Sequence, residues 1–188
     1  WYNLSTHLPW IGMRTAKLDG AHVEYCRGIA NPVGVKVGPS MGADWVQGLC
    51  EVLNPAREPG RLILIHRMGA AQIEARLPPL VEAVRATGIP VLWVCDPMHG
   101  NTESTQSGLK TRRFENIVAE LEQAFRIHRA LGSHLGGVHF ELTGEDASAW
   151  QRQFEVELCR HLYPFLHEQR PDRAFDLVLR RGPSTTPF

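Results

Sequence analysis

The sequence predicts an α/β fold built on about five parallel strands with helices between them. Short apolar runs alternate with longer amphipathic segments along most of the 188 residues. The apolar runs are nearly continuous rather than alternating, which is typical of strands covered on both faces. A regular strand–helix–strand order implies right-handed crossovers between parallel neighbours.

Five apolar runs are predicted strands. The fourth of them contains Val91-Leu92-Trp93-Val94-Cys95 and leads directly into the polar segment Asp96-Pro97-Met98-His99. The predicted strands cover residues 7–12, 33–37, 62–66, 91–95 and 138–142. Five strands are too few to close an eight-stranded barrel.

Helices are predicted between the strands, over residues 16–26, 43–53, 70–86, 112–130 and 149–168. Asn54-Pro55 ends the second helix, and Gly88 marks the exit of the third. The fourth has the clearest apolar stripe, which includes Phe114, Leu121 and Phe125. Residues 181–188 have an irregular composition and are expected to form a tail.

Composition and charge exclude several classes of protein. The chain has 43% apolar and 21% charged residues and zero formal net charge, which is ordinary for one globular domain. A neutral balance argues against nucleic-acid or acidic membrane partners. No apolar run approaches the ~20 residues of a membrane helix.

The cysteines and the N-terminal residues favour the cytoplasm. The four cysteines are widely spaced and form no CxxC pair, which fits reduced thiols. The start at Trp1 shows no basic segment followed by an apolar one, so no signal peptide is expected. It also lacks an initiator Met, which leaves open whether residues precede it.

Three cations follow or lie within the first three predicted strands: Arg14, Lys36 and Arg67. If these strands are neighbours, the cations converge on one rim, where phosphate or carboxylate is the natural ligand. Each cation alone is more simply a solvated or ion-paired surface group. Lys36 is the exception, because a charge inside an apolar strand needs a partner or a ligand.

His99 and Glu141, after the fourth and fifth strands, form a possible metal pair. Two ligands do not complete a site, and a histidine beside a glycine is more often structural. The basic segment Lys110 to Arg113 is predicted to open the fourth helix, where cations oppose the helix dipole. This local conflict suggests anion binding, although a solvated cluster explains it equally well.

Taken in order, these loops resemble one family, the class II 3-deoxy-D-arabino-heptulosonate 7-phosphate (DAHP) synthases. The resemblance covers residues 10–146. It rests on Trp10-Ile11-Gly12, Leu18-Asp19-Gly20-Ala21-His22, Ala30 to Pro39, Asn54-Pro55, Glu58 to Leu62, Arg67-Met68-Gly69, Cys95 to Thr102, Lys110 to Phe114 and Gly136 to His139.

The resemblance implies a (β/α)8 barrel that joins phosphoenolpyruvate to erythrose 4-phosphate with a divalent metal, manganese, cobalt or zinc. It implies that Arg14, Lys36 and Arg67 hold the phosphoenolpyruvate phosphate and that Lys110 and Arg112 lie at the active-site mouth. It places His99 and Glu141 on metal-ligand positions, and Asp172 lies at a distance comparable to that of the last metal ligand.

The sequence also departs from the family pattern. It corresponds to the second half of the barrel, so the family's cysteine ligand and its carboxylate-binding loop are absent from these residues. Met13 stands where the family usually has Glu. We therefore expect a half-barrel over residues 1–146, a divergent helical segment over 147–180 and a tail over 181–188.

Half a barrel exposes two sheet edges and one face. Three alternatives would cover them: a missing half that precedes Trp1, the pairing of two chains, or the C-terminal helix lying on the exposed face. We favour a homodimer.

Three functions fit the sequence. The first is a metal-assisted aldol-type transferase acting on phosphoenolpyruvate, with Lys36 and His99 among its catalytic residues. The second is a repurposed small enzyme of specialised metabolism that acts on another anionic substrate, with or without a metal. Its acid/base groups would be drawn from His99, Glu141, Glu145 or His66. The third is a non-catalytic partner of a full-length synthase.

Overall fold

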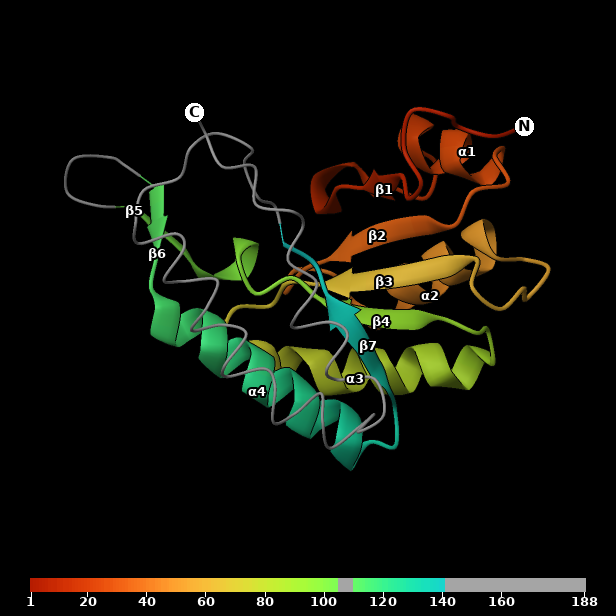
Figure 1. Cartoon of the computed structure of the whole chain (residues 1–188). Coiled ribbons are helices and arrows are strands. Elements are labelled where there is room, and N and C mark those ends of the chain that lie inside the picture. The colour runs from red at the N-terminus through yellow and green to blue at the C-terminus, as the bar shows by residue number, and fades with distance from the viewer. Residues whose placement is uncertain (105–109, 141–188) are drawn as a thin grey trace, which may run out of the picture. The chain divides into compact units, whose positions relative to one another are not determined.

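The described part of the chain, residues 1–104 and 110–140 of a computed structural model, confirms the α/β prediction. Its main feature is a five-stranded parallel sheet in the order β1-β2-β3-β4-β7. The strands are β1 (Trp10–Ile11), β2 (Val33–Val37), β3 (Leu62–His66), β4 (Leu92–Cys95) and β7 (Leu135–Val138). Each main-sheet strand pairs with its neighbour in chain order, as in a partial (β/α)8 barrel (Figure 1).

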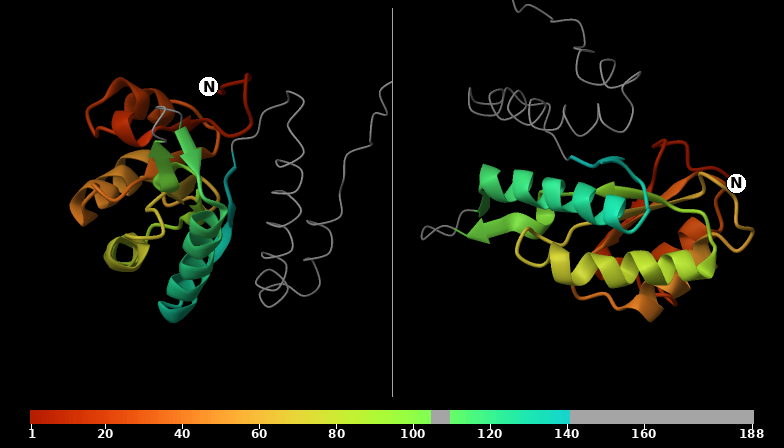
Figure 2. Two further views of the ribbon diagram at one scale, coloured as in Figure 1. Left: turned by 90° about the vertical axis from the view of Figure 1, so that its left-hand side faces the viewer. Right: turned by 90° about the horizontal axis from the view of Figure 1, so that it is seen from below.

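Helices connect these strands and pack side by side on one face of the sheet (Figure 2). The α-helices are α1 (Ala21–Arg27), α2 (Ala43–Leu53), α3 (Ile73–Thr87) and α4 (Phe114–Ala130). Two short 3-10 helices follow strand ends, η1 (Met13–Thr15) after β1 and η2 (His99–Asn101) after β4. The carboxyl ends of the strands therefore carry short, ordered loops, which is where parallel α/β folds place their sites.

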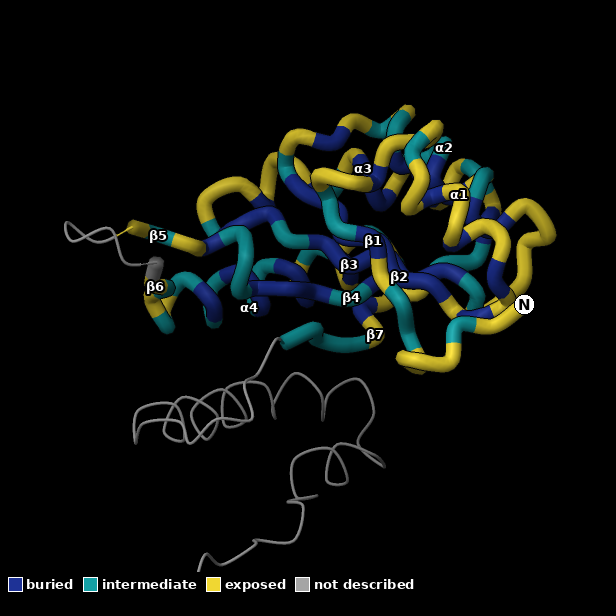
Figure 3. Tube along the Cα trace, turned by 90° about the horizontal axis from the view of Figure 1, so that it is seen from above, coloured by how far each residue is buried: buried dark blue, intermediate teal, exposed yellow. Residues whose placement is uncertain are grey.

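The core is centred on β2 and β3, in which every residue is buried (Figure 3). This agrees with the continuous apolar runs that predicted both strands with their observed bounds. The second predicted helix also matches α2 in both bounds, because Asn54-Pro55 stops it as expected.

The two faces of the sheet differ in what they carry. The ring of His66 lies 5.6 Å from that of His128 on α4, so His66 points to the helix face. Lys36 pairs in register with Ile65, the residue before His66. Because successive strand side chains alternate, Lys36 points to the opposite face.

The first strand and first helix are shorter than predicted. The strand prediction over residues 7–12 was too long, since the ladder begins at the carbonyl of Pro9, which accepts from the Gly34 amide at 2.9 Å. The helix predicted from residue 16 starts at Ala21, because residues 17–20 form a turn closed by a 2.9 Å bond from the Gly20 amide to the Lys17 carbonyl.

The last strand lies earlier than predicted. Residues 138–142 were expected, but β7 is Leu135–Val138 and includes Gly136 and Gly137. A Cβ at Gly136 would lie 2.2 Å from Cδ1 of Leu92. The Leu92 side chain of β4 therefore occupies the space that a side chain at residue 136 would take, and the two glycines made the strand resemble a loop in the sequence.

The basic segment before α4 does not begin the helix, contrary to the prediction. Lys110–Arg112 is strand β6, which pairs antiparallel with β5 (Thr102–Ser104). Arg113 is the N-cap in an extended conformation, and Glu115 supplies an acidic residue in the first turn of α4. The apparent conflict with the helix dipole disappears, because the cations precede the helix.

No helix among the described residues is long and apolar enough to cross a membrane. The predicted boundary at residues 146/147, the helical segment over 147–180 and the tail over 181–188 lie outside the described residues, as do residues 141 and 142 of the predicted fifth strand.

Candidate functional site

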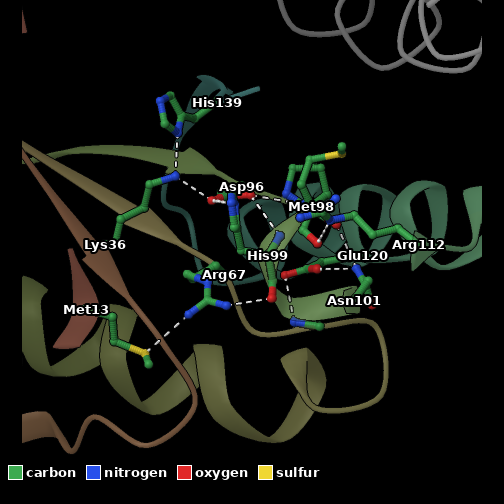
Figure 4. Close-up of polar contacts among 12 residues, drawn as sticks. Met13, Lys36, Arg67, Asp96, Met98, His99, Asn101, Arg112, Glu120 and His139 are labelled. Carbon is green, nitrogen blue, oxygen red and sulfur yellow. Dashed lines mark hydrogen bonds and ion pairs between the residues drawn. The ribbon is translucent and has the colours of Figure 1, made fainter. Parts of the chain in front are cut away.

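The candidate site lies where β2, β3, β4 and β7 end, and its side chains point toward one another (Figure 4). Lys36 belongs to β2, Arg67 follows β3, Asp96 follows β4, and His139 follows β7. The sheet order makes these strands neighbours, so the predicted convergence at one rim is met for Lys36 and Arg67.

Lys36 is held by partners from two other strands. Its side chain is only 4% exposed, and Nζ donates hydrogen bonds to Oδ2 of Asp96 and to Nδ1 of His139. Nζ also lies 5.1 Å from the ring centroid of Trp10, within range of a cation–π contact. The partner that a lysine in an apolar strand requires is therefore Asp96, and the role of Lys36 in anion binding or catalysis stays a prediction.

Asp96 is the hub of the polar contacts. Burial by itself raises the pKa of this carboxyl, but the hydrogen bond and charge of Lys36, with help from His99, bring the pKa below its usual value. Oδ1 accepts from the amides of Met98 and His99 at 3.0 and 3.2 Å. Asp96 is thus a charged carboxylate at neutral pH, fixed by both side chains and backbone.

Asp96 also orients the His99 ring. Nδ1 of His99 lies 2.8 Å from Oδ2 of Asp96. An ionised carboxylate only accepts hydrogen bonds, so Nδ1 carries the proton and the lone pair of a neutral ring is on Nε2. A carboxylate bonded to the far nitrogen is the usual support of a metal-ligating histidine. The geometry therefore suits the metal-ligand role predicted for His99.

Arg67 lies beside this pair. Nη2 donates to the His99 carbonyl at 2.5 Å, and Nη1 lies 3.6 Å from Sδ of Met13. Nε is buried and has no hydrogen-bond partner among the residues that the structure describes. No carboxylate among the described residues forms an ion pair with Arg67, so its charge is available to an anionic ligand.

The remaining predicted residues differ in how the structure places them. Arg14 is exposed in η1, directly after Met13, and Arg112 donates from Nε to the Met98 carbonyl at 2.8 Å. The backbone of Lys110 lies in β6, and its side chain is outside the described part. The predictions that also lie outside it are Glu141, Glu145 and Asp172. His66, an acid/base candidate, is fully buried on the helix face, away from this rim.

Sequence reasoning missed the group that holds the two site loops together, the carboxylate of Glu120 on α4. Its Oε1 accepts from the amides of Met68 and Gly69 at 2.8 and 2.9 Å, and Oε2 accepts from Nδ2 of Asn101 at 2.7 Å. Oδ1 of Asn101 in turn accepts from the Ala70 amide at 2.9 Å. An acidic residue on an apolar stripe gave the only available signal.

Two glycines complete the contact between these loops. A Cβ at Gly100 would lie 2.3 Å from the amide nitrogen of Gly69, and one at Gly69 would lie 2.6 Å from the Gly100 carbonyl oxygen. Gly69 also has a φ of +83°, which side chains rarely adopt. The loops that carry Arg67 and His99 are therefore in direct backbone contact, which fixes their spacing.

Comparison of the sequence with known protein families identifies the family of this chain. The sequence profile of the class-II DAHP synthetase family matches residues 1–151. The chain belongs to this family. The resemblance predicted from the loop motifs is thereby confirmed.

Three relatives are named phospho-2-dehydro-3-deoxyheptonate aldolases. The chain is 51% identical over 147 residues to the phospho-2-dehydro-3-deoxyheptonate aldolase of Streptomyces coelicolor, covering 78% of this chain and 33% of the relative. It is 50% identical to AroG of Mycolicibacterium smegmatis (78% and 32%) and to the Neurospora crassa enzyme (77% and 31%). The chain therefore spans about a third of the length of these relatives.

Replacing Lys36 by Met is expected to destabilise this class-II family member by about 3–5 kcal/mol at pH 7, because it leaves the buried Asp96 carboxylate without its cation. The pKa of Asp96 then rises above that of the unfolded chain. The loss of stability in the variant is therefore present at neutral pH. It shrinks as the pH falls, because Asp96 of the variant becomes protonated in the folded as well as in the unfolded chain. Urea unfolding of the wild type and the variant at several pH values from 7 to 4 measures this difference in the free energy of unfolding.

The matched control is Lys17→Met, which removes an exposed lysine and is expected to change stability by less than about 0.5 kcal/mol. In the double variant K36M/D96N, the amide oxygen still accepts from the Met98 and His99 amides, so part of the loss is recovered. A K36M variant as stable as K17M at pH 7 would contradict this account of the pair.

Proposed function

We propose that the chain takes part in a metal-assisted aldol-type condensation of phosphoenolpyruvate with an aldose phosphate, at the entry to the shikimate pathway of aromatic biosynthesis. The names of the relatives, which are about 50% identical over 147 residues, support this reaction class. The anion-binding rim and the oriented His99 support it independently of the relatives.

One observation carries the proposal: Arg67 is half-buried at the strand rim without a carboxylate partner among the described residues. Its neighbours, the His99 carbonyl and the Met13 sulfur, are both uncharged. A partly buried guanidinium without a counter-ion is a strong site for a phosphate, which it can bind through two parallel hydrogen bonds. We assign the phosphoenolpyruvate phosphate to Arg67, with Arg14 and Lys36 nearby.

The residues present fit a divalent metal in part. His99 would ligate through Nε2, while Asp96 holds Nδ1, and Glu141 and Asp172 are the further ligands that we propose. Manganese, cobalt or zinc suits a nitrogen and carboxylate donor set. When bound, the metal would polarise the aldehyde carbonyl. Lys110 and Arg112 would bind the aldose phosphate, and Glu145 is a further acid/base candidate.

Met13 favours a second candidate function, a repurposed enzyme for a different anionic substrate. Its sulfur contacts Arg67 at a position where the family usually carries Glu. An uncharged neighbour changes the electrostatics around the bound anion, and a metal-free reaction is compatible with this candidate.

Arg67→Ala tests the anion site. Calorimetry is expected to show phosphoenolpyruvate binding to the wild-type chain and a loss of about 10- to 100-fold in affinity in the variant, because charge-assisted hydrogen bonds are removed. The control, Arg27→Ala, removes an exposed arginine that pairs with Glu24 and should leave binding unchanged.

Turnover assays of the same samples separate the candidates. Condensation of phosphoenolpyruvate with erythrose 4-phosphate when manganese is added supports the synthase. Binding without turnover supports the repurposed enzyme. Absence of both binding and turnover overturns the anion site and favours a non-catalytic partner of a full-length synthase.

We also propose that the protein is a cytoplasmic homodimer. Reduced thiols at Cys26, Cys50 and Cys95 fit that compartment. Trp10 and Leu92 lie on the same face as Lys36 and are 44% and 42% exposed, and such apolar groups favour association.

Sedimentation equilibrium at micromolar concentration tests the dimer. The expected mass is twice 21.1 kDa, and Trp10→Lys should shift it to the monomer because a charge cannot be buried in an apolar contact. Lys17→Met, on an exposed residue, is the control. A wild-type chain that sediments as a monomer would overturn the dimer.

A further inference from the structure

Three metal-ligating side chains converge inside the layer between the sheet and α4. They are His66 at the end of β3, Cys95 at the end of β4 and Glu120 on α4. One donor atom from each lies within 4.8 Å of the others, and all three residues have a relative exposure of 0%. They lie on the helix face, opposite the face that carries Lys36, so they are separate from the site proposed above.

The backbone fixes the three donors. His66 and Cys95 are register partners on adjacent strands, so their side chains lie next to each other on one face. The Glu120 carboxylate is held by two backbone amides and by Asn101, as described above. Such bonds are typical of the outer hydrogen bonds that orient a carboxylate ligand.

His66 is the observation that packing alone does not explain. Both ring nitrogens are buried, and neither has a hydrogen-bond partner among the described residues. A buried polar group without a partner is costly, and native proteins usually satisfy one through a neighbour or a ligand. A bound cation would satisfy one of these nitrogens directly.

We propose that His66, Cys95 and Glu120 form a second, structural metal site that takes a zinc-type divalent cation. Nitrogen, thiolate sulfur and carboxylate oxygen are all ligands of zinc. The thiolate and carboxylate together neutralise the two positive charges, while the imidazole stays neutral. The complex therefore has no net charge, which suits a site without access to water. It would tie α4 to the ends of β3 and β4.

The protonation of the metal-free site is consistent with this assignment. Burial, with smaller effects of Glu120 and Asp96, raises the pKa of the Cys95 thiol, and burial raises the pKa of Glu120 to about 7. Burial and the neighbouring His128 lower the pKa of His66 to about 3. Metal binding would displace protons from the acidic groups, so affinity is expected to rise with pH.

Cobalt(II) titration of the full chain after chelator treatment tests the site. Cobalt is the spectroscopic probe, and a sulfur-to-cobalt charge-transfer band reports a thiolate ligand. We expect one equivalent to produce the band, zinc to abolish it by competition, and zinc to raise the Tm of the chain.

Variants locate the site. Cys95→Ser is expected to lose the band, while Cys50→Ser, which changes another buried cysteine, keeps it. His66→Leu removes the unpartnered ring, so without metal it should unfold at a Tm no lower than wild type, yet bind zinc at least about tenfold more weakly. A Tm that does not fall together with weaker zinc binding distinguishes metal ligation from a packing role of His66. If C95S does not fold, H66L alone tests the site.

His99→Ala is expected to retain the band, since it alters the other face of the sheet. The proposal is overturned if the wild-type chain gives no band, if the band survives in C95S, or if H66L binds zinc as tightly as wild type. These outcomes do not depend on phosphoenolpyruvate, so this site and the proposed function fail independently.

Discussion

The ion pair between Lys36 and Asp96 is the contact on which the candidate site depends. Lys36 starts on β2 and reaches across β3 to a carboxylate at the end of β4. Burying two charges has a large desolvation cost, so such a pair contributes more to specific geometry than to net stability. Its effect here is to keep Asp96 ionised, and an ionised Asp96 sets the direction of the His99 ring.

On the helix face of the sheet, Glu120 supports the two loops that carry the site residues. Glu120 anchors the loop after β3 and, through Asn101, the loop after β4. The contact between Gly69 and Gly100 leaves no room for a side chain at either position. Glu120 on α4 therefore positions the loops that carry Arg67 and His99, and Asp96 in addition orients the ring of His99. A metal beside Glu120 would strengthen the first of these supports.

The sequence was most informative where local signals agree. Continuous apolar runs defined β2 and β3, and Asn54-Pro55 defined the end of α2. It failed where tertiary contacts decide, as at Gly136, whose missing side chain makes room for Leu92. The strand-end cations were visible in the sequence, but the roles of Asp96 as the partner of Lys36 and of Glu120 as the support of the two loops were not assigned. Their roles depend on register and helix packing, which no local pattern encodes.

The most direct test of this account is the tautomer of His99, measured by long-range ¹H–¹⁵N correlation in the ¹⁵N-labelled, metal-free chain at neutral pH, with assignment from His99→Ala. The exposed His22 serves as the reference, because its ratio of the two neutral tautomers is set by solvent alone. An ionised Asp96 predicts a proton on Nδ1 and a lone pair on Nε2 of His99. A proton on Nε2 with Nδ1 unprotonated would contradict it, because Asp96 would then not orient the ring.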